Sequence, residues 1–176
     1  MTEPNPKSKG VHMEIIGIIS DTHIPSRTKA IPPRVFEIFN DVNLIIHAGD
    51  LVHLNVIKEL EKIAPVTAVY GNMDPYEVRK HLPRINSIAL NDWKIGVFHD
   101  PGALWGMSGM RKIVRENNFD ALIFGHIHKP FVKEEGGFLF INPGSPTNPL
   151  PPLLAKPSVG LLKVTKEKIE PIIVKF

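Results

Sequence analysis

The stretch "LIIHAGDLV", residues 44–52, changes from apolar to polar within a few positions. Its first half is apolar and lacks helical periodicity, which is typical of a buried strand. Gly49 and Asp50 come shortly after this strand. A carboxylate is costly to bury unless it is paired or binds a cation. This strand end therefore indicates a polar site rather than a simple turn.

The same pattern occurs at five places along the chain. The other four apolar runs that end in polar residues are "IGIISDTH", "VTAVYGNMD", "KIGVFHD" and "ALIFGHIH". Ligands of open α/β sheets bind at the carboxyl ends of the strands, so we expect these five ends to meet. They would bring together Asp21, His23, Asp50, Asn72, His99, His126 and His128. The remaining histidines, His12, His47, His53 and His81, are interpreted as ordinary hydrogen-bonded residues.

Strands and helices alternate through the first two thirds of the chain. Strands are predicted at residues 14–20, 43–48, 66–70 and 120–124. Helices are predicted within residues 54–65 from apolar spacing, from Pro32 and Pro33 to residue 40, and over residues 109–118 with Ser108 as the cap. This alternation predicts a largely parallel sheet that helices cover on both faces.

The final third has a different character. Turn signals at Asn91, Gly136 and Lys166 each separate two apolar segments, which predicts three antiparallel hairpins. Parallel strands combined with hairpins form either one wide mixed sheet or two packed sheets with helices outside. The proline-dense segment 142–157 predicts a stiff, ordered loop.

The size and composition of the chain restrict the class of protein. A length of 176 residues suits one well-buried domain, predicted over residues 13–176 after a flexible polar tail at residues 1–12. No apolar run reaches the roughly 18 residues of a membrane span, and the start lacks the features of a secretory signal. We therefore expect a cytoplasmic protein without a membrane partner. The net charge of +3, with scattered Lys and Arg, does not demand nucleic acid.

The chain contains no cysteine, which excludes disulfides and thiolate ligands. A metal must then be held by His, Asp, Glu or Asn. Seven candidate ligands exceed the needs of one ion and suit two divalent ions about 3.5 to 4 Å apart that share a carboxylate. Asp50 is the predicted bridge, because Gly49 lets the backbone turn close to the ions.

The polar strand ends also form an ordered set of motifs. These are Asp21-Thr22-His23, Gly49-Asp50, Gly71-Asn72-Met73-Asp74, His99, Gly125-His126-Ile127-His128 and "NPGS" at residues 142–145. From residue 14 onward the chain resembles the calcineurin-like metallophosphoesterases, in particular their small single-domain phosphodiesterase branch. The resemblance implies an α/β fold, a four-layer sandwich of two mixed β-sheets flanked by helices.

The resemblance also implies how the ligands divide between two ions. The first ion would bind Asp21, His23, Asp50 and His128, and the second would bind Asp50, Asn72, His99 and His126. Many relatives prefer Mn²⁺, and some use Ni²⁺, iron or Zn²⁺. Sulfur-free ligands argue only against a purely soft site. We expect two divalent ions, with Mn²⁺ as the first choice.

The charge of such a centre suits phosphodiester hydrolysis. Two divalent ions beside the carboxylates of Asp21 and Asp50 leave a net charge of about +2. A phosphodiester and a hydroxide balance this charge. We therefore expect a metal-dependent phosphodiesterase that hydrolyses a small phosphodiester through a metal-bound hydroxide, with Asn72 both ligating and orienting.

Asp74 and Asp100 depart from the family pattern. Many relatives carry a His near the Asn, close to the leaving group, and we place Asp74 in this catalytic position. An ionised carboxylate there would repel a dianionic monoester and so favour diesters; alternatively, Asp74 orients an imidazole. Asp100 replaces a usual Gly and either bonds a ligand or caps the following loop. In that loop, Trp105 is either a mobile lid or packed into the surface.

Two other functions compete with this prediction. One relative of the family, the retromer cargo subunit, is a non-catalytic scaffold, but such proteins typically lose metal ligands and this chain keeps all seven. A nuclease would need an extended basic groove, which a net charge of +3 does not indicate. Nucleic acid is thus disfavoured as a partner, while a monomer and a homo-oligomer are both compatible with the sequence.

Overall fold

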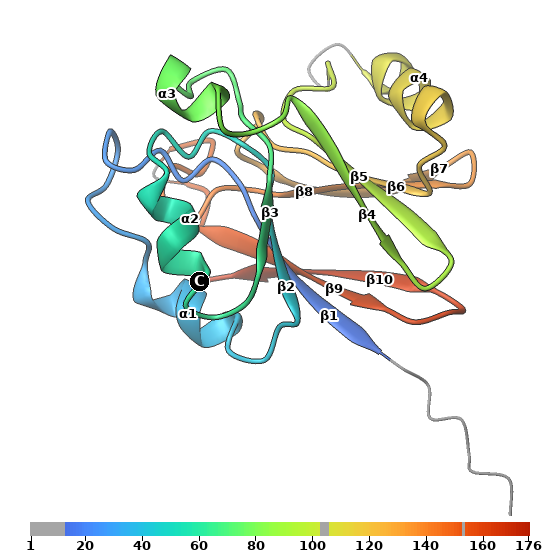
Figure 1. The fold of residues 1–176 in the computed structure, drawn as a ribbon, viewed down its shortest axis with the longest axis horizontal. Helices are drawn as coiled ribbons and strands as arrows, with labels where there is room; N and C mark the ends of the chain where they lie inside the picture. Colours follow the sequence, from blue (N-terminus) through green and yellow to red (C-terminus); the bar gives the residue numbers. More distant parts are fainter. Residues whose placement is uncertain (1–12, 103–105, 153) are drawn as a thin grey trace, which may run out of the picture.

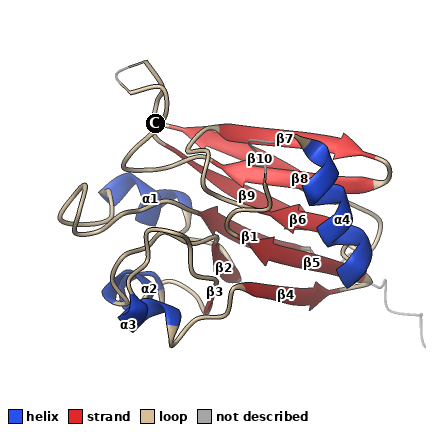
Figure 2. Cartoon of the chain, turned by 90° about the horizontal axis from the view of Figure 1, so that it is seen from above, coloured by secondary structure: helices blue, strands red, loops and turns tan. Residues whose placement is uncertain are grey.

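The computed structural model describes residues 13–102, 106–152 and 154–176. The predicted tail at residues 1–12 and the predicted lid residue Trp105 lie outside the described residues. In the described ranges, ten strands form two five-stranded sheets (Figures 1 and 2). Within the described part of the chain, no helix is long and apolar enough to cross a membrane.

The first sheet has the order β10-β9-β1-β2-β3 and is mixed. Strands β1, β2 and β3 are parallel, whereas β9 is antiparallel to both β1 and β10. In the register, Ile18 of β1 lies opposite Ile46 of β2. The strands are β1 (Glu14–Ile19), β2 (Leu44–His47), β3 (Val66–Ala68), β9 (Ser158–Val164) and β10 (Ile169–Lys175).

The second sheet has the order β4-β5-β6-β8-β7. Its centre, β5-β6-β8, is parallel, and the outer strands β4 and β7 pair antiparallel with β5 and β8. The strands are β4 (Ile85–Leu90), β5 (Trp93–Phe98), β6 (Ala121–Ile123), β7 (Pro130–Glu135) and β8 (Phe138–Pro143). The two sheets decide between the architectures that the sequence allowed, and the predicted sandwich of two mixed sheets with flanking helices is confirmed.

Three apolar clusters separate the layers of this sandwich. One lies between the first sheet and helices α1 (Pro33–Ile38) and α2 (Asn55–Leu60), the second between the sheets, and the third between the second sheet and α4 (Met107–Asn117). In β6, Ala121 and Ile123 join the cluster between the sheets, whereas Leu122 packs toward α4. Central strands are thus buried on both faces, which explains their unbroken apolar sequence.

Several local predictions differ from the structure. Helix α4 begins at Met107 with Gly106 as its N-cap, so the prediction that Ser108 caps the helix is wrong. Gly106 has φ 95°, a conformation that glycine adopts without strain. The short helix α3 (Tyr76–Arg79) was not predicted, and β3 ends at Ala68 rather than at residue 70. The three hairpins are confirmed, and Asn91 and Gly136 adopt the positive φ that tight turns require.

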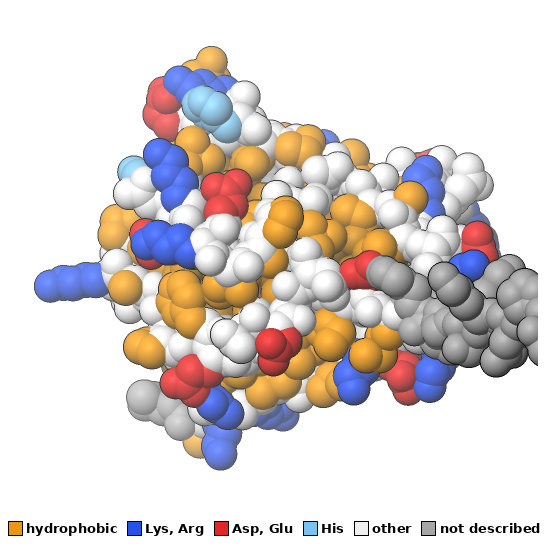
Figure 3. All heavy atoms as spheres, turned by 60° about the horizontal axis from the view of Figure 1, so that its bottom comes forward, with side chains coloured by type: hydrophobic (Ala, Val, Ile, Leu, Met, Phe, Trp, Pro, Cys, Tyr) orange, Lys and Arg blue, Asp and Glu red, His pale blue; other side chains and the backbone are white. Residues whose placement is uncertain are grey.

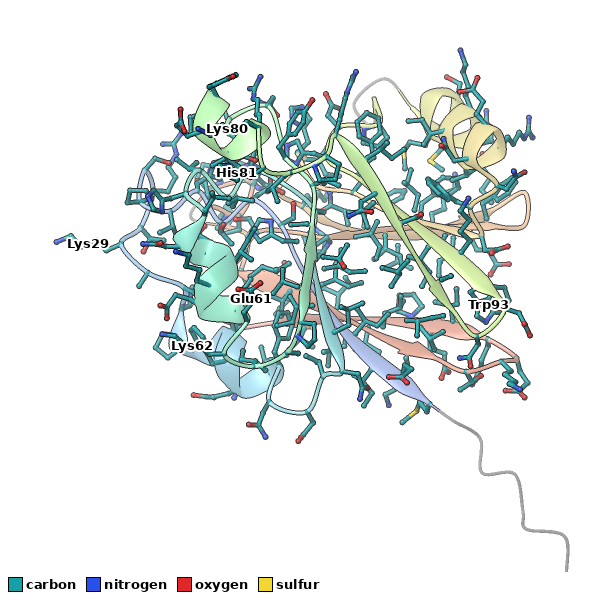
Figure 4. The ribbon with its side chains drawn as sticks, in the orientation of Figure 1. Lys29, Glu61, Lys62, Lys80, His81 and Trp93 are labelled. Carbon is teal, nitrogen blue, oxygen red and sulfur yellow. The ribbon has the colours of Figure 1, made fainter. Side chains whose placement is uncertain are left out.

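The surface carries mixed charge on the face that Figure 3 shows, where Lys and Arg side chains lie scattered among acidic and apolar ones. A hydrogen bond joins the two sheets at the side of the molecule where Trp93 is labelled in Figure 4. There the indole Nε1 of Trp93, at the start of β5, donates to the carbonyl of Thr165 in the β9–β10 turn at 2.8 Å. The two sheets are therefore connected by a specific hydrogen bond as well as by their apolar cluster.

Candidate metal centre

The structure brings all seven predicted ligands together at the carboxyl ends of the central strands. Asp21 and His23 follow β1, Asp50 follows β2 and Asn72 follows β3 in the first sheet. His99 follows β5, and His126 and His128 follow β6 in the second sheet. Because both sheets present these ends on the same side, the candidate centre lies where the two sheets meet.

One group of ligands consists of four buried side chains, Asp21, His23, Asp50 and His128, whose ligand atoms all lie within 4.8 Å of one another. Nε2 of His128 is 3.2 Å from Oδ1 of Asp21 and 3.1 Å from Nε2 of His23. Nε2 of His23 is 3.9 Å from Oδ2 of Asp50. Two imidazole nitrogens and two carboxylates around one point suit a divalent cation.

A second group overlaps the first at Asp50. Oδ1 of Asn72 lies 2.9 Å from Nδ1 of His126 and 3.1 Å from Nε2 of His99. Nε2 of His99 in turn lies 3.3 Å from Oδ2 of Asp50. The same carboxylate oxygen therefore faces both groups, which is the geometry that a shared, bridging ligand requires.

The backbone at these positions is strained. Positive φ angles occur at Asp21 (54°), His23 (46°), Asp50 (57°), His126 (72°) and His128 (54°). A residue other than glycine in this region costs about 1 kcal/mol or more, and such residues cluster at functional sites. Hydrogen bonds hold the strained loops together, because the N–H groups of Asp21 and His23 donate to the carbonyls of Gly49 and Asp50, both at 3.0 Å.

Two glycines of the motifs lie against ligand side chains. A Cβ at Gly71 would overlap the Oδ1 atom of Asp50. A Cβ at Gly125 would overlap Ser20 Oγ and lie 2.8 Å from Nδ1 of His99. These positions need glycine because the ligands approach the backbone so closely.

The histidine rings are oriented by backbone carbonyls. Nδ1–H of His99 donates to the carbonyl of Ala48 and Nδ1–H of His128 donates to the carbonyl of Asn148, both at 2.7 Å. A hydrogen bond of this kind leaves the unprotonated Nε2 free for a metal ion. Nε2 is also the atom that faces the carboxylates in both rings.

The proline-dense loop contributes contacts that the sequence did not reveal. The hydroxyl of Ser145 donates to the carbonyl of Asp21 at 2.7 Å, and the hydroxyl of Thr147 donates to the carbonyl of Thr22 at 2.8 Å. Together with the carbonyl of Asn148 on His128, these contacts join the loop to both groups of motifs. The proline content of residues 142–157 predicted an ordered loop, and the "NPGS" motif within it was the signal that linked this loop to the centre.

The negative charges of Asp21 and Asp50 affect the protonation of the neighbouring imidazoles. Burial alone would lower the pKa of His99, but its hydrogen bond to Asp50 and the charges of Asp21 and Asp50 raise the pKa to about 9. For His128, burial is likewise outweighed by the hydrogen bond and charge of Asp21, so its pKa is raised. In the absence of a cation, the carboxylates therefore draw protons onto the imidazoles. A divalent cation would supply the same positive charge, so the donor set fits such an ion.

Asp74 points into the protein rather than toward the ligands. Its side chain is 1% exposed, and its carboxylate accepts backbone N–H groups from Asp50, Val52 and Gly71 at 3.0, 2.6 and 2.7 Å. Burial is the largest effect on the pKa of Asp74 and raises it, although these donors oppose the rise. The exposed neighbour of Asn72 is Met73, at 57%. These contacts favour a positioning role for Asp74 over contact with a leaving group.

The other candidate residues lie at the edge of the centre or outside it. Oδ1 of Asp100 accepts the N–H of Gly102 at 3.0 Å, as a loop cap would, while Oδ2 lies 3.8 Å from Nε2 of His126.

The remaining histidines are not among the ligands. His47 is buried beside Thr22 and Gly49. His81, labelled in Figure 4, contacts the carbonyl of Glu77 at 2.8 Å. Nδ1 of His53 accepts the N–H of Asn55 at 3.1 Å, and His12 lies outside the described residues.

Comparison with known proteins agrees with this geometry. The family model of the calcineurin-like phosphoesterase superfamily domain matches residues 13–167. The chain belongs to this superfamily.

Two relatives and one solved structure cover nearly the whole chain. It is 41% identical over 162 residues to a probable metallophosphoesterase of Methanothermobacter thermautotrophicus, covering 92% of both chains. It is 34% identical over 174 residues to a phosphodiesterase of Methanocaldococcus jannaschii, covering 90% of this chain and 98% of that one. The fold is similar to that of vacuolar protein sorting 29 from Cryptosporidium parvum, with a TM-score of 0.76 and 23% identity over 93% and 98% of the two chains.

Proposed function

We propose that this calcineurin-like phosphoesterase is a two-metal phosphodiesterase that acts on a small phosphodiester. The observation that carries the proposal is the position of Asp50, whose Oδ2 lies 3.9 Å from Nε2 of His23 in one ligand group and 3.3 Å from Nε2 of His99 in the other. One carboxylate facing two groups of donors suits a pair of ions better than a single ion.

The chain's own residues would hold the reacting groups in place. Asp21 and Asp50 supply two negative charges, and the rings of His99 and His128 present Nε2 because Nδ1 is engaged by backbone carbonyls. Divalent cations in such a site acidify a water molecule and neutralise the charge on the phosphoryl oxygens. Asn72, which carries no charge, can orient a ligand without reducing the positive charge of the centre.

The preference for diesters is supported by the relative from M. jannaschii, which is named a phosphodiesterase and is 34% identical to this chain. The preference no longer depends on repulsion by Asp74, because that carboxylate is buried among backbone N–H groups. Mn²⁺ is the first ion to test, because the family resemblance implies it and the nitrogen and oxygen ligands are compatible with it.

The proposal is tested by removing metals with a chelator, adding back Mn²⁺, and measuring hydrolysis of bis(p-nitrophenyl) phosphate beside p-nitrophenyl phosphate. We expect Mn²⁺-dependent hydrolysis that favours the diester and is abolished in Asp50→Asn. Asp92→Asn, in the exposed β4–β5 turn, is the matched control and should keep its activity. Hydrolysis of the monoester alone would refute the diester preference.

A non-catalytic scaffold remains the alternative from another class of protein. The likeness to vacuolar protein sorting 29 is a likeness of fold, and the full set of ligands favours an enzyme. If the purified chain binds neither Mn²⁺ nor Zn²⁺ and hydrolyses no ester, the scaffold would be the better interpretation. A nuclease is less well supported, because the net charge is only +3 and the Lys and Arg residues are scattered along the sequence.

A further inference from the structure

A small cavity opens directly beside the second ligand group. It has a volume of about 300 Å³, and Asn72 and His99 form its wall toward the metal centre. Two arginines, Arg79 and Arg84, and the rings of Tyr70 and Phe98 line the rest of it together with Gly71 and Asp100. A cavity of this size has room for a phosphate group and the atoms that carry it.

Arg79 is held rigidly at the edge of this cavity. It is the last residue of α3, directly before Lys80 and His81, which Figure 4 labels. Its Nε donates to the carbonyl of Asp74 and its Nη2 donates to the carbonyl of Asn72, both at 2.6 Å. Because these partners are neutral carbonyls, the positive charge of Arg79 is not cancelled, and the side chain also supports the loop that presents Asn72.

Arg84 has a different environment. It precedes β4, and its guanidinium lies over the ring of Phe98, 5.3 Å from the ring centroid. Within residues 13–102, 106–152 and 154–176, no carboxylate forms an ion pair with Arg84. The aromatic ring restricts the guanidinium without neutralising it, so its donors are available to an anion.

We propose that this cavity is a substrate subsite that binds a second anionic group, namely a phosphate carried by the same substrate as the scissile diester, with Arg84 as its specificity-determining residue. The inference rests on the proposed function and extends it, because it names the substrate class as phosphodiesters with an additional phosphate. Two arginines outweigh the single carboxylate of Asp100, and a guanidinium fork matches a phosphate with paired hydrogen bonds.

The position of the cavity supports this arrangement. A substrate whose scissile phosphoryl group lies at the metal centre beside Asp50 would extend past Asn72 and His99 toward Arg84. Arginine also serves better than lysine here, because its planar group can stack on Phe98 and bind phosphate at the same time. Arg79 contributes charge, but its contacts with the Asn72 loop make its removal a less specific test.

The inference is tested with two substrates that differ by one phosphate: the p-nitrophenyl ester of thymidine 5′-phosphate, and the same ester with a 3′-phosphate. We expect the Mn²⁺-loaded protein to prefer the second substrate. Arg84→Gln should lower kcat/KM for the 3′-phosphorylated ester roughly tenfold or more and change the other by less than about twofold. Arg84→Lys should retain part of the preference.

The matched control is Arg34→Gln. Arg34 is an exposed arginine of α1 that pairs with Glu37 and does not line the cavity. It should leave both rates unchanged. A binding measurement provides a second readout: calorimetry of the Mn²⁺-loaded protein should show thymidine 3′,5′-bisphosphate binding more tightly than thymidine 5′-phosphate, with the difference lost in Arg84→Gln.

The two readouts separate the inference from the proposed function. If neither ester is hydrolysed but Arg84→Gln still loses the difference in binding, the proposed function fails and the anion subsite stands. If both esters are hydrolysed equally and Arg84→Gln alters neither rate nor binding, the phosphodiesterase stands and the subsite is refuted.

Discussion

The carboxylate of Asp74 accepts the backbone N–H of Asp50 at 3.0 Å. Asp50 has φ 57°, a conformation in which its backbone cannot continue the pairing of β2. Asp74 therefore satisfies a buried donor at the residue whose own side chain faces both ligand groups. The N–H groups of Val52 and Gly71 depend on the same carboxylate, so Asp74 connects the loops after β2 and β3.

The variant Asp74→Asn should weaken this connection. An amide has one oxygen and one NH₂ group, so at least one of the three N–H donors would face another donor. We expect a loss of about 1 to 3 kcal/mol in the free energy of unfolding and weaker binding of Mn²⁺. Urea unfolding and calorimetry measure the two effects, with Asp92→Asn as the control. Unchanged stability and Mn²⁺ affinity would contradict a positioning role.

An imidazole should be tolerated at position 73 but not at position 74. Met73 is exposed beside Asn72, whereas Asp74 is 1% exposed and has no room for a larger ring. We expect Met73→His to fold normally and to accelerate hydrolysis of esters with poor leaving groups, because a nearby imidazole can donate a proton to the departing oxygen. Asp74→His should be strongly destabilised. The comparison uses a p-nitrophenyl and an alkyl phosphodiester, and equal rates for Met73→His and the unmodified protein on both would contradict the prediction.

The two ligand groups should differ in affinity for metal. The four side chains of the first group are all buried, whereas Asn72 in the second group is exposed. We expect two Mn²⁺ ions per chain with unequal affinities, and one ion of nearly unchanged affinity in Asn72→Ala. Asp50→Asn should weaken both sites. Metal analysis after dialysis and a calorimetric titration provide the counts, and loss of both ions in Asn72→Ala would contradict the division of ligands.

Much of the architecture could be predicted from local patterns. The apolar runs around Ile18, Ile46 and Ile123 form central strands that are buried on both faces, and such short unbroken runs indicate strands in a sequence. The polar residues that follow each run indicated the position of the centre. Turn residues such as Asn91 and Gly136 have positive φ angles that their side chains, or the lack of one, make accessible. These features depend on neighbours in the sequence.

Contacts between distant segments could not be predicted in the same way. The partners of Asp74 are backbone N–H groups from its own loop and from the loop after β2, and nothing in "GNMD" distinguishes that orientation from one toward the solvent. The support of Asp21 by Ser145 joins residues 124 positions apart. Helix α3 is only four residues long, too short for a periodic apolar pattern.

His47 gives the protein a pH-dependent stability. It is completely buried, its Nδ1 accepts the N–H of Gly49, and its Nε2 lies 3.1 Å from Oγ1 of Thr22. Burial lowers the pKa of His47 to about 4 from the ordinary value of 6.5, despite the opposing charge of Asp21. The unfolded chain therefore binds a proton more readily than the folded one. Stability contributed by neutral His47 is present above pH 6.5 and is lost as the pH falls from there toward 4.

The loss should amount to about 2 kcal/mol between roughly pH 7.5 and 5. We expect His47→Gln to be less stable than the unmodified protein at neutral pH, but to lose less stability on acidification, because glutamine does not titrate. Urea unfolding in the presence of a chelator measures both slopes without competition from metal. His81→Gln, at an exposed position two residues after α3, is the control and should follow the unmodified protein. If His47→Gln and the unmodified protein lose stability in parallel, another group must carry the pH dependence.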